Sequence, residues 1–294
     1  LEHGSGGISG FMNLDGYTAF FNCLFIFSAL VTVLFSKRYL SGRLGNPDEF
    51  YLLLLISTLG AMVLAAAEHF AVFLLGLEIM SISLYVLVAY PEEGNPPLEA
   101  ALKYLVLSGV ASTTMLFGMA LVYNATGTLN VSGLAAGVPG IADGDQRFLV
   151  VGHGLLIIGL AFKLSLVPLH MWTPDVVQGA PAPVSGYLAT VSKAAVFAFL
   201  MRYIFESDAV TYPAILQVLA FVAVLSMVVG NLLALRQRNL KRLLAYSSIA
   251  HAGYLIITVI VLVTVVGFRE SAEAAMFYLV GYTLMTLVAF GVVG

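Results

Sequence analysis

Long apolar runs separated by short polar segments dominate the chain. A bilayer core about 30 Å thick is crossed by a helix of roughly 20 apolar residues. Nine stretches approach or exceed that length: 16–35, 50–67, 70–90, 98–123, 148–168 with a continuation over 170–179, 183–205, 213–235, 243–265 and 273–294. They do not alternate between apolar and polar residues, as the strands of a membrane barrel do. The pattern therefore predicts an all-α, polytopic transmembrane bundle of about nine spans.

Composition supports the same class and excludes several others. Hydrophobic residues make up 60% of the 294 positions and charged residues 10%, whereas a soluble domain carries about 25% charged residues. The net charge of −3 gives no basic footprint for nucleic acid, so we expect the lipid bilayer and no nucleic acid as a partner. A single cysteine, Cys23, excludes an internal disulfide or CxxC cluster site within the chain. The sequence contains no GxGxxG or P-loop motif, and the histidines show no metal-ligand spacing, so we expect no metal, no cofactor and no redox centre of its own.

Basic residues set the predicted orientation. Seven of the thirteen lie in two loops: Lys37, Arg38 and Arg43 in one, and Arg236, Arg238, Lys241 and Arg242 in the other. The positive-inside rule makes the side that carries such loops cytoplasmic. Counting spans, the two loops share a side only if residues 148–179 cross the membrane once.

Residues 148–179 are too long to cross the membrane once as a single straight helix, and Pro168 explains how they do so. As one helix, 148–179 would measure about 48 Å. Proline removes a backbone N–H, and its ring clashes with the preceding turn, so we expect the helix to break near 165–169 and to restart with Thr173 as N-cap. Asn46-Pro47 predicts a capped start for another helix. Broken helices are typical of ion pathways in transporters.

Four ionisable residues fall inside apolar runs at a similar predicted depth: Glu78, Lys163, Lys193 and His251. Such a residue costs about 2.5–3.5 kcal/mol on insertion scales and usually faces the bundle interior. We interpret them as a lateral row of proton-exchanging groups, in which a Glu78–Lys163 pair that closes and opens would switch the proton affinity of the lysine. The alternative is that buried charges pair permanently and fix helix packing, and that His251 only hydrogen-bonds a carbonyl.

Other polar residues carry weaker signals. Lys103 lies about one turn inside its helix and either belongs to the proton path or extends to the cytoplasmic interface. Glu68 and His69 are expected to cap helices or to lie at an interface. His170 and Asp175 flank the restarted helix and either line a cavity or contribute to packing.

Several motifs carry a specific resemblance to a known family. They are KLSLVPLHMWTPD at 163–175, QGAPAPVS at 178–185, GLEIMS at 76–81, SKA at 192–194, NLKRLLAYSSIAHAGY at 239–254 and DEFY at 48–51. With them the chain resembles, over nearly all of residues 13–294, the antiporter-like proton-translocating membrane subunits of respiratory complex I and its relatives. The pattern is most similar to the subunit N branch of bacterial NADH–quinone oxidoreductases.

The resemblance implies a role for each buried ionisable residue. Glu78 matches the family's key glutamate, Lys163 its broken-helix lysine and Lys193 the connecting lysine. His251 matches a histidine on the path to the second half, and Lys103 a lysine near the cytoplasmic end. These five residues form the implied proton pathway.

The resemblance also implies how the chain is organised. The family folds as an inverted repeat of five-helix units with a broken helix in each. Residues 1–49 would then form a loop, one helix and a cytoplasmic loop, residues 50–205 the first unit, and residues 206–294 the truncated start of the second. We expect residues 1–7 to lie in a loop of a longer chain, and the second broken helix to follow Gly294.

By resemblance, the chain is a proton-translocating subunit of NADH–quinone oxidoreductase in a bacterial inner membrane, coupled to remote quinone reduction. NADH, FMN, iron–sulfur clusters and quinone are expected in partner subunits, and the neighbours in the membrane arm include other antiporter-like subunits. Two alternatives stay open. One is a subunit of a multi-subunit cation/proton antiporter or membrane-bound hydrogenase, and the other is a non-conducting membrane scaffold.

Overall fold

The computed structural model describes residues 10–41, 46–90, 95–134, 143–207 and 213–294. Nine helices in this part of the chain are long and apolar enough to cross a membrane, and no β-strand occurs within it. The predicted all-α polytopic bundle is therefore confirmed.

The first half of the bundle contains four long helices, α1 (Gly16–Leu40), α2 (Pro47–Ala66), α3 (Phe70–Ala89) and α4 (Asn95–Thr126). The second half is more irregular. It comprises α6 (Asp143–Lys163), α7 (Trp172–Gly179), α8 (Ala182–Tyr187), the π-helix η2 (Leu188–Ser192), α9 (Lys193–Glu206), α10 (Pro213–Leu235), α11 (Leu240–Val261), the π-helix η4 (Leu262–Val266) and α12 (Phe268–Val293). A short 3₁₀ turn, η1 (Val131–Gly133), follows α4.

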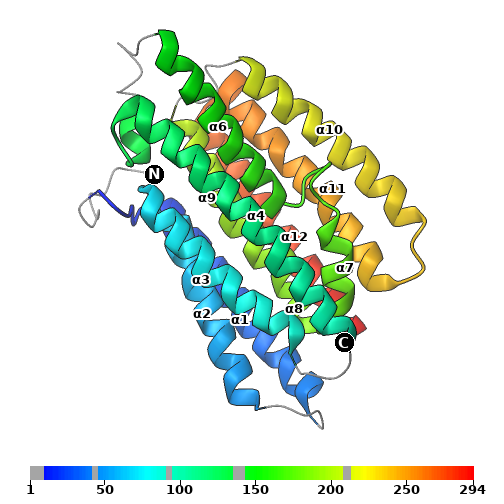
Figure 1. The fold of residues 1–294 in the computed structure, drawn as a ribbon. Helices are drawn as coiled ribbons and strands as arrows, with labels where there is room; N and C mark the ends of the chain where they lie inside the picture. The colour runs from blue at the N-terminus through cyan, green and yellow to red at the C-terminus, as the bar shows by residue number, and fades with distance from the viewer. Residues whose placement is uncertain (1–9, 42–45, 91–94, 135–142, 208–212) are drawn as a thin grey trace.

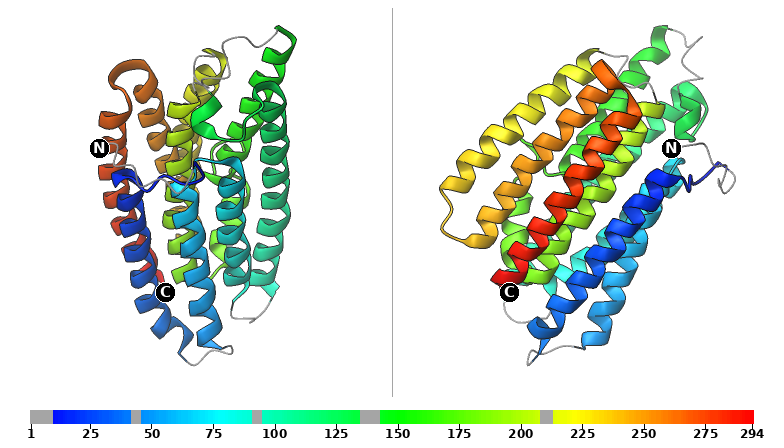
Figure 2. Two further views of the ribbon diagram at one scale, coloured as in Figure 1. Left: turned by 90° about the vertical axis from the view of Figure 1, so that its left-hand side faces the viewer. Right: turned by 180° about the vertical axis from the view of Figure 1, so that it is seen from behind.

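The long helices lie side by side along one common direction (Figures 1 and 2). Helix α9 runs through the middle of the bundle, with α1, α2 and α3 on one side and α10 and α11 on the other. Its side chains are buried from Lys193 to Ile204. A polar residue on α9 therefore faces protein from every side.

The described basic residues of the two predicted loops lie at the same end of the molecule. Lys37 and Arg38 fall in the last turn of α1 and Lys241 and Arg242 in the first turn of α11, whereas Arg43 lies outside the described residues. Helix α1 ends, and α11 begins, at the lower end of the view in Figure 1. We call this the basic end, and the other the opposite end. The two sets of basic residues share this end because α6 and α7 together cross the bundle once. The count of spans predicted this single crossing.

Local sequence accounts for the start of α2 and for its close packing on α3. The Asn46 side chain accepts a hydrogen bond from the backbone N–H of Asp48, and Pro47 occupies the first turn, so the predicted cap is confirmed. Where α2 meets α3, a Cβ atom on Gly76 would lie 2.7 Å from the backbone nitrogen of Leu64. This close approach fixes the part of α3 that carries Glu78.

Candidate functional site

The helix that carries Lys163 breaks where the sequence predicts. Helix α6 ends at Lys163, Ser165 adopts a left-handed conformation with φ of 62°, and α7 begins at Trp172. The predicted break near 165–169 is therefore confirmed. The predicted N-cap is wrong, because Thr173 lies inside α7 and its hydroxyl donates to the Ser165 hydroxyl at 2.6 Å.

Side chains of other segments satisfy the backbone groups that the break frees. The Val167 N–H donates to Ser226 Oγ on α10 at 2.9 Å, and the Phe162 carbonyl accepts from the indole Nε1 of Trp172 at 3.1 Å. In a bilayer core no water is available for unpaired backbone groups, so a broken helix persists only where protein supplies such partners. The irregular backbone beside Lys163 is therefore a built feature of the bundle.

The Lys163 amine is buried among hydroxyl groups. Its side chain is 4% exposed, and Nζ donates to Ser81 Oγ on α3 at 2.8 Å and to Ser108 Oγ on α4 at 2.6 Å. The Tyr85 hydroxyl donates to the same Ser108 oxygen at 2.6 Å. A hydroxyl both donates and accepts, so this cluster has the groups needed to pass a proton to or from the amine.

Glu78 stands one turn before Ser81 on α3, next to this cluster. Its side chain is half-buried, and its Oε1 atom has no hydrogen-bond partner among the residues that the structure describes. Within the same residues, no ion pair of 4.0 Å or less joins Glu78 to Lys163. The partner that α3 gives to the amine is therefore Ser81, on the same helix as Glu78, and the predicted opening and closing of a Glu78–Lys163 pair stays a prediction.

Lys193 is the second buried lysine, and it also follows an irregular stretch of helix. The π-helix η2 runs from Leu188 to Ser192 and ends at this lysine. Its side chain is 4% exposed, and Nζ donates to Ser248 on α11, to Oγ at 2.9 Å and to the carbonyl oxygen at 3.3 Å. Single π turns within α-helices are frequent at functional sites.

His251 lies one turn after Ser248 on α11 and continues this second cluster. Its Nδ1 shares a hydrogen bond with the Tyr278 hydroxyl of α12, so its partner there is a hydroxyl and not a carbonyl. The Tyr254 and Tyr282 rings lie 5.6 and 5.0 Å from the imidazole. His251, Tyr278 and Tyr282 line a cavity of about 420 Å³ that is otherwise mostly apolar.

Four of the five predicted site residues thus fall into two clusters. Glu78 and Lys163 gather at α3, α4 and α6, and Lys193 and His251 gather at α9, α11 and α12. The sequence reasoning missed the polar side chains that serve them, which are Ser81, Tyr85, Ser108, Ser248 and Tyr278. Two of these carried a readable signal, since Ser81 and Ser248 each stand three residues from an ionisable side chain on an apolar helix, on the same face.

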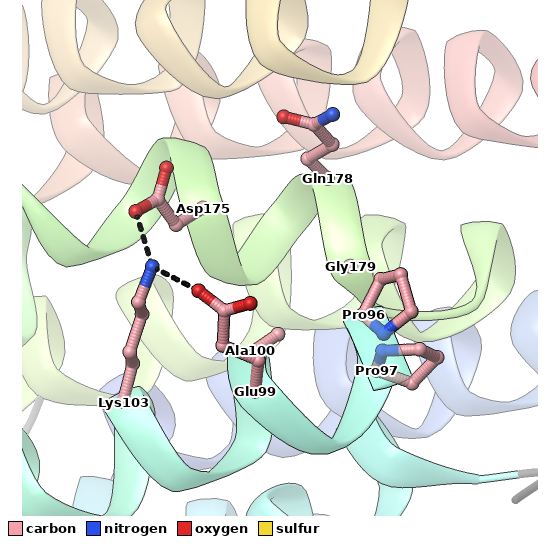
Figure 3. Close-up of a pocket in the computed structure, with 8 residues that line it drawn as sticks. All are labelled: Pro96, Pro97, Glu99, Ala100, Lys103, Asp175, Gln178 and Gly179. Atoms are coloured by element: carbon pink, nitrogen blue, oxygen red, sulfur yellow. Dashed lines mark hydrogen bonds and ion pairs between the residues drawn. The ribbon is translucent and has the colours of Figure 1, made fainter. Parts of the chain in front are cut away.

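The fifth residue, Lys103, lies apart from both clusters. Its side chain is 42% exposed, and its amine pairs with Glu99 Oε1 at 2.7 Å and with Asp175 Oδ2 at 3.1 Å (Figure 3). The position agrees with the interfacial alternative of the prediction. His69 accepts from the Ala71 N–H at the start of α3, so its predicted capping role is confirmed.

A third charged cluster, at the opposite end, has no counterpart in the sequence reasoning. Arg202 is 3% exposed, and its guanidinium contacts Asp15 at 3.2 Å, Glu206 at 3.8 Å and Glu68 at 3.9 Å. Burial opposes the ionisation of Asp15, but the Arg202 charge and hydrogen bonds from Thr18 and Arg202 bring its pKa below the usual value. Among the described residues, no group of three or more His, Cys, Asp or Glu could hold a metal ion.

One known family matches most of the chain. A family described as "NADH:quinone oxidoreductase/Mrp antiporter, TM" matches residues 67–294, which include Glu78, Lys103, Lys163, Lys193 and His251.

Three solved structures resemble the whole fold. A chain of respiratory complex I from Thermus thermophilus with bound aureothin is 42% identical with a TM-score of 0.77, and the match covers 95% of this chain and 57% of that one. A chain of the membrane-bound sulfane sulfur reductase, an archaeal respiratory membrane complex, is 32% identical with a TM-score of 0.79, over 92% of this chain and 54% of that one. A chain of the Mrp complex from Dietzia sp. DQ12-45-1b shares the fold with 21% identity and a TM-score of 0.76, over 92% and 49% of the two chains. The present chain spans about half the length of each.

Proposed function

Because the chain belongs to the NADH:quinone oxidoreductase/Mrp antiporter membrane family, we propose that it moves protons through the two lysine clusters of its bundle. The relatives whose structures it matches are parts of multi-subunit membrane complexes. In such a complex this chain would supply a proton path, and the energy would come from chemistry or gradients in partner subunits.

One observation carries the proposal: a lysine amine is buried beside a broken helix, and among the residues that the structure describes its hydrogen-bond partners are all neutral hydroxyl groups. A buried charge is stabilised by a close opposite charge and destabilised without one. Approach of the Glu78 carboxylate would favour the ammonium form of Lys163. Separation would favour release of the proton through the serine and tyrosine hydroxyls, each of which accepts one proton as it donates its own to the next group. The distance between the two side chains would thus control proton uptake and release.

The second cluster would take the proton further. Within the described part of the chain, no carboxylate is a partner of the Lys193 amine, and Ser248 links that amine to the turn of α11 that carries His251. An imidazole accepts a proton on one nitrogen and releases one from the other. In this scheme His251 passes protons onward through the Tyr278 hydroxyl, with which it shares a hydrogen bond.

The complex that we favour is a bacterial NADH–quinone oxidoreductase, with this chain as its subunit N. The 42% identity to a chain of Thermus thermophilus complex I supports this choice. The enzyme would then be a proton translocase of the inner membrane. NADH, FMN, iron–sulfur clusters and quinone would bind to partner subunits, and other antiporter-like subunits would lie beside this chain.

The test is Lys163→Met in the intact complex, reconstituted into proteoliposomes. Methionine matches the lysine side chain as far as Cε and removes the proton-binding amine. We expect the protons moved per substrate turnover to fall severalfold in an assembled complex, while Lys37→Met, which removes an exposed lysine of α1, leaves the ratio unchanged. An unaltered ratio in Lys163→Met would remove Lys163 from the proton path.

A second candidate is a subunit of another respiratory or antiporter complex. The sulfane sulfur reductase chain supports it, with a TM-score of 0.79. The partners that co-purify with the native chain separate the two candidates, because NADH oxidation needs a flavin subunit and a cation/proton antiporter has only membrane subunits. A membrane-bound hydrogenase would instead show hydrogen-dependent turnover, and a non-conducting scaffold would leave pumping intact in the Lys163 variant.

A further inference from the structure

The short helix α7 is held at the basic end by charged side chains from two other helices. Asp175, in its first turn, accepts from Lys103 of α4 at 3.1 Å through Oδ2 and from Arg242 of α11 at 2.6 Å through Oδ1. Figure 3 shows the Lys103 amine between the Asp175 and Glu99 carboxylates. One carboxylate therefore joins three helices that are far apart in the sequence.

The other end of α7 is held by the same region of α11. Lys241 donates to the carbonyl oxygens of Gln178 at 3.2 Å and Ala180 at 2.6 Å, and Arg242 donates to the Gln178 side-chain oxygen at 2.9 Å. Cations are favourable near the carbonyl end of a helix. A helix of eight residues is too short to be stable alone, so α7 keeps its place through these contacts and its packing.

The position of α7 is also tied to the backbone beside Lys163. The indole of Trp172 donates to the Phe162 carbonyl, and the Thr173 hydroxyl donates to Ser165, so the first turn of α7 contacts the end of α6 and the break itself. The Trp172 ring stacks between Tyr104 of α4, at 4.8 Å, and Phe162 of α6, at 5.5 Å. A shift of α7 would therefore displace the turn that places the Lys163 amine.

The ion pairs of Asp175 are partly exposed and individually weak. The side chains of Lys103, Asp175 and Arg242 are 42%, 37% and 28% exposed, and exposed pairs contribute only about 0.2–1 kcal/mol each. A cavity of about 360 Å³ borders Lys103, Asp175 and Gln178, which gives these side chains room to change partners. A permanent anchor would be buried, as Arg202 is.

From these contacts we infer that Asp175 is a positioning residue, which holds α7 between α4 and α11 and so couples the α11 cluster of Ser248 and His251 to the broken turn after Lys163. The positioning itself is a property of the fold. Its consequence for transport rests on the proposed function.

Hydrogen–deuterium exchange of the assembled complex tests the positioning directly. We expect the backbone amides of 164–179 to exchange roughly three- to tenfold faster in Asp175→Asn, since two charged pairs are lost. Glu99→Gln is the matched control, because Glu99 lines the same cavity and pairs with the same lysine, and among the described residues it forms no ion pair with α7. Asp175→Glu, which keeps the carboxylate, should restore most of the protection.

Equal exchange in Asp175→Asn and Glu99→Gln, or no rescue by Asp175→Glu, would overturn the inference. The same variants in proteoliposomes give the second readout, with fewer protons per turnover expected for Asp175→Asn and not for Glu99→Gln. A normal ratio in Asp175→Asn, in a complex where Lys163→Met does lower it, would overturn the coupling to transport. A normal ratio in Lys163→Met would instead count against the proposed function and leave the exchange result to decide the positioning of α7.

Discussion

In the described part of the chain, the bundle buries three cationic side chains and surrounds them in two different ways. Lys163 and Lys193, in the central region, have amines bonded to serine hydroxyls and one carbonyl. Arg202, at the opposite end, is surrounded by Asp15, Glu68 and Glu206. The carboxylates around Arg202 stabilise a permanent positive charge, whereas the neutral partners of the two lysines allow the protonation state of each amine to change.

Physical chemistry gives this difference a meaning. Arginine stays protonated in proteins, and its planar guanidinium suits several carboxylates at once. A lysine loses its proton far more readily when it is buried without a counter-charge. The partners of Arg202 thus suit a structural tie between α1, α9 and the loop before α3, whereas the partners of the two lysines leave both protonation states open.

Replacing a buried lysine with arginine should have the largest effect, and it tests whether the lysine must change its protonation state. Lys193→Arg keeps a positive charge but removes the ability to release a proton, so we expect protons per turnover to fall severalfold or more, as for Lys163→Met. The measurement is proton transport in proteoliposomes against substrate turnover. Transport at the normal ratio would show that Lys193 is a fixed charge like Arg202. Arg202→Lys is the reciprocal control, and it should leave the ratio unchanged.

Serine variants should produce a smaller effect, and one that differs between the two lysines. The Lys163 amine has two serine acceptors, whereas Lys193 has one serine and that serine's own carbonyl. Ser248→Ala should therefore lower protons per turnover more than Ser81→Ala, by about twofold or more, because an unmade buried hydrogen bond costs about 1–3 kcal/mol. The same assay measures both, and equal effects would contradict a relay through Ser248.

The smallest expected effect concerns the Arg202 cluster and the stability of the complex. Asp15→Asn should lower the free energy of unfolding at pH 7 by roughly 1.5–3 kcal/mol, the contribution typical of a hydrogen bond to a charged group, and leave protons per turnover unchanged. Thermal unfolding of the purified complex measures the change. Asp48→Asn, at an exposed acid in the first turn of α2, is the control.

The difference in unfolding free energy between the native protein and Asp15→Asn should depend on pH, and the direction of that dependence follows from the ionisation of Asp15. The pKa of Asp15 is lowered in the fold, so the carboxylate contributes its full stability above its unfolded pKa of about 3.9 and loses it as the pH falls toward the folded value. The gap between the native protein and Asp15→Asn should therefore shrink as the pH falls below about 4. A gap that grows as the pH falls would contradict the assigned ionisation state.

The sequence was sufficient for the spans and for the broken helix. Apolar runs of the right length and the backbone chemistry of Pro168 act locally, so the nine spans and the break near 165–169 were predictable. The predicted N-cap at Thr173 was wrong because Ser165, across the turn, binds that hydroxyl. Local propensity was overridden there by a contact that depends on the completed turn.

The partners of the site residues were harder to predict. Ser108 meets Lys163 across 55 residues, and Asp15 meets Arg202 across 187. Such pairs depend on how the helices pack, which hydropathy does not reveal. The depth of a charge along its helix was readable from the sequence, but its neighbours around the helix axis were not.

The π-helix before Lys193 shows how much one residue changes such a neighbourhood. Each residue of an α-helix turns the chain by about 100°, and a π turn holds about one residue more than an α turn. The stretch from Leu188 to Ser192 therefore rotates the side chains of α9 about the helix axis by about a quarter-turn, relative to an uninterrupted α-helix. The extra residue in that turn thus determines which side of the helix axis Lys193 occupies, and so allows its amine to reach Ser248.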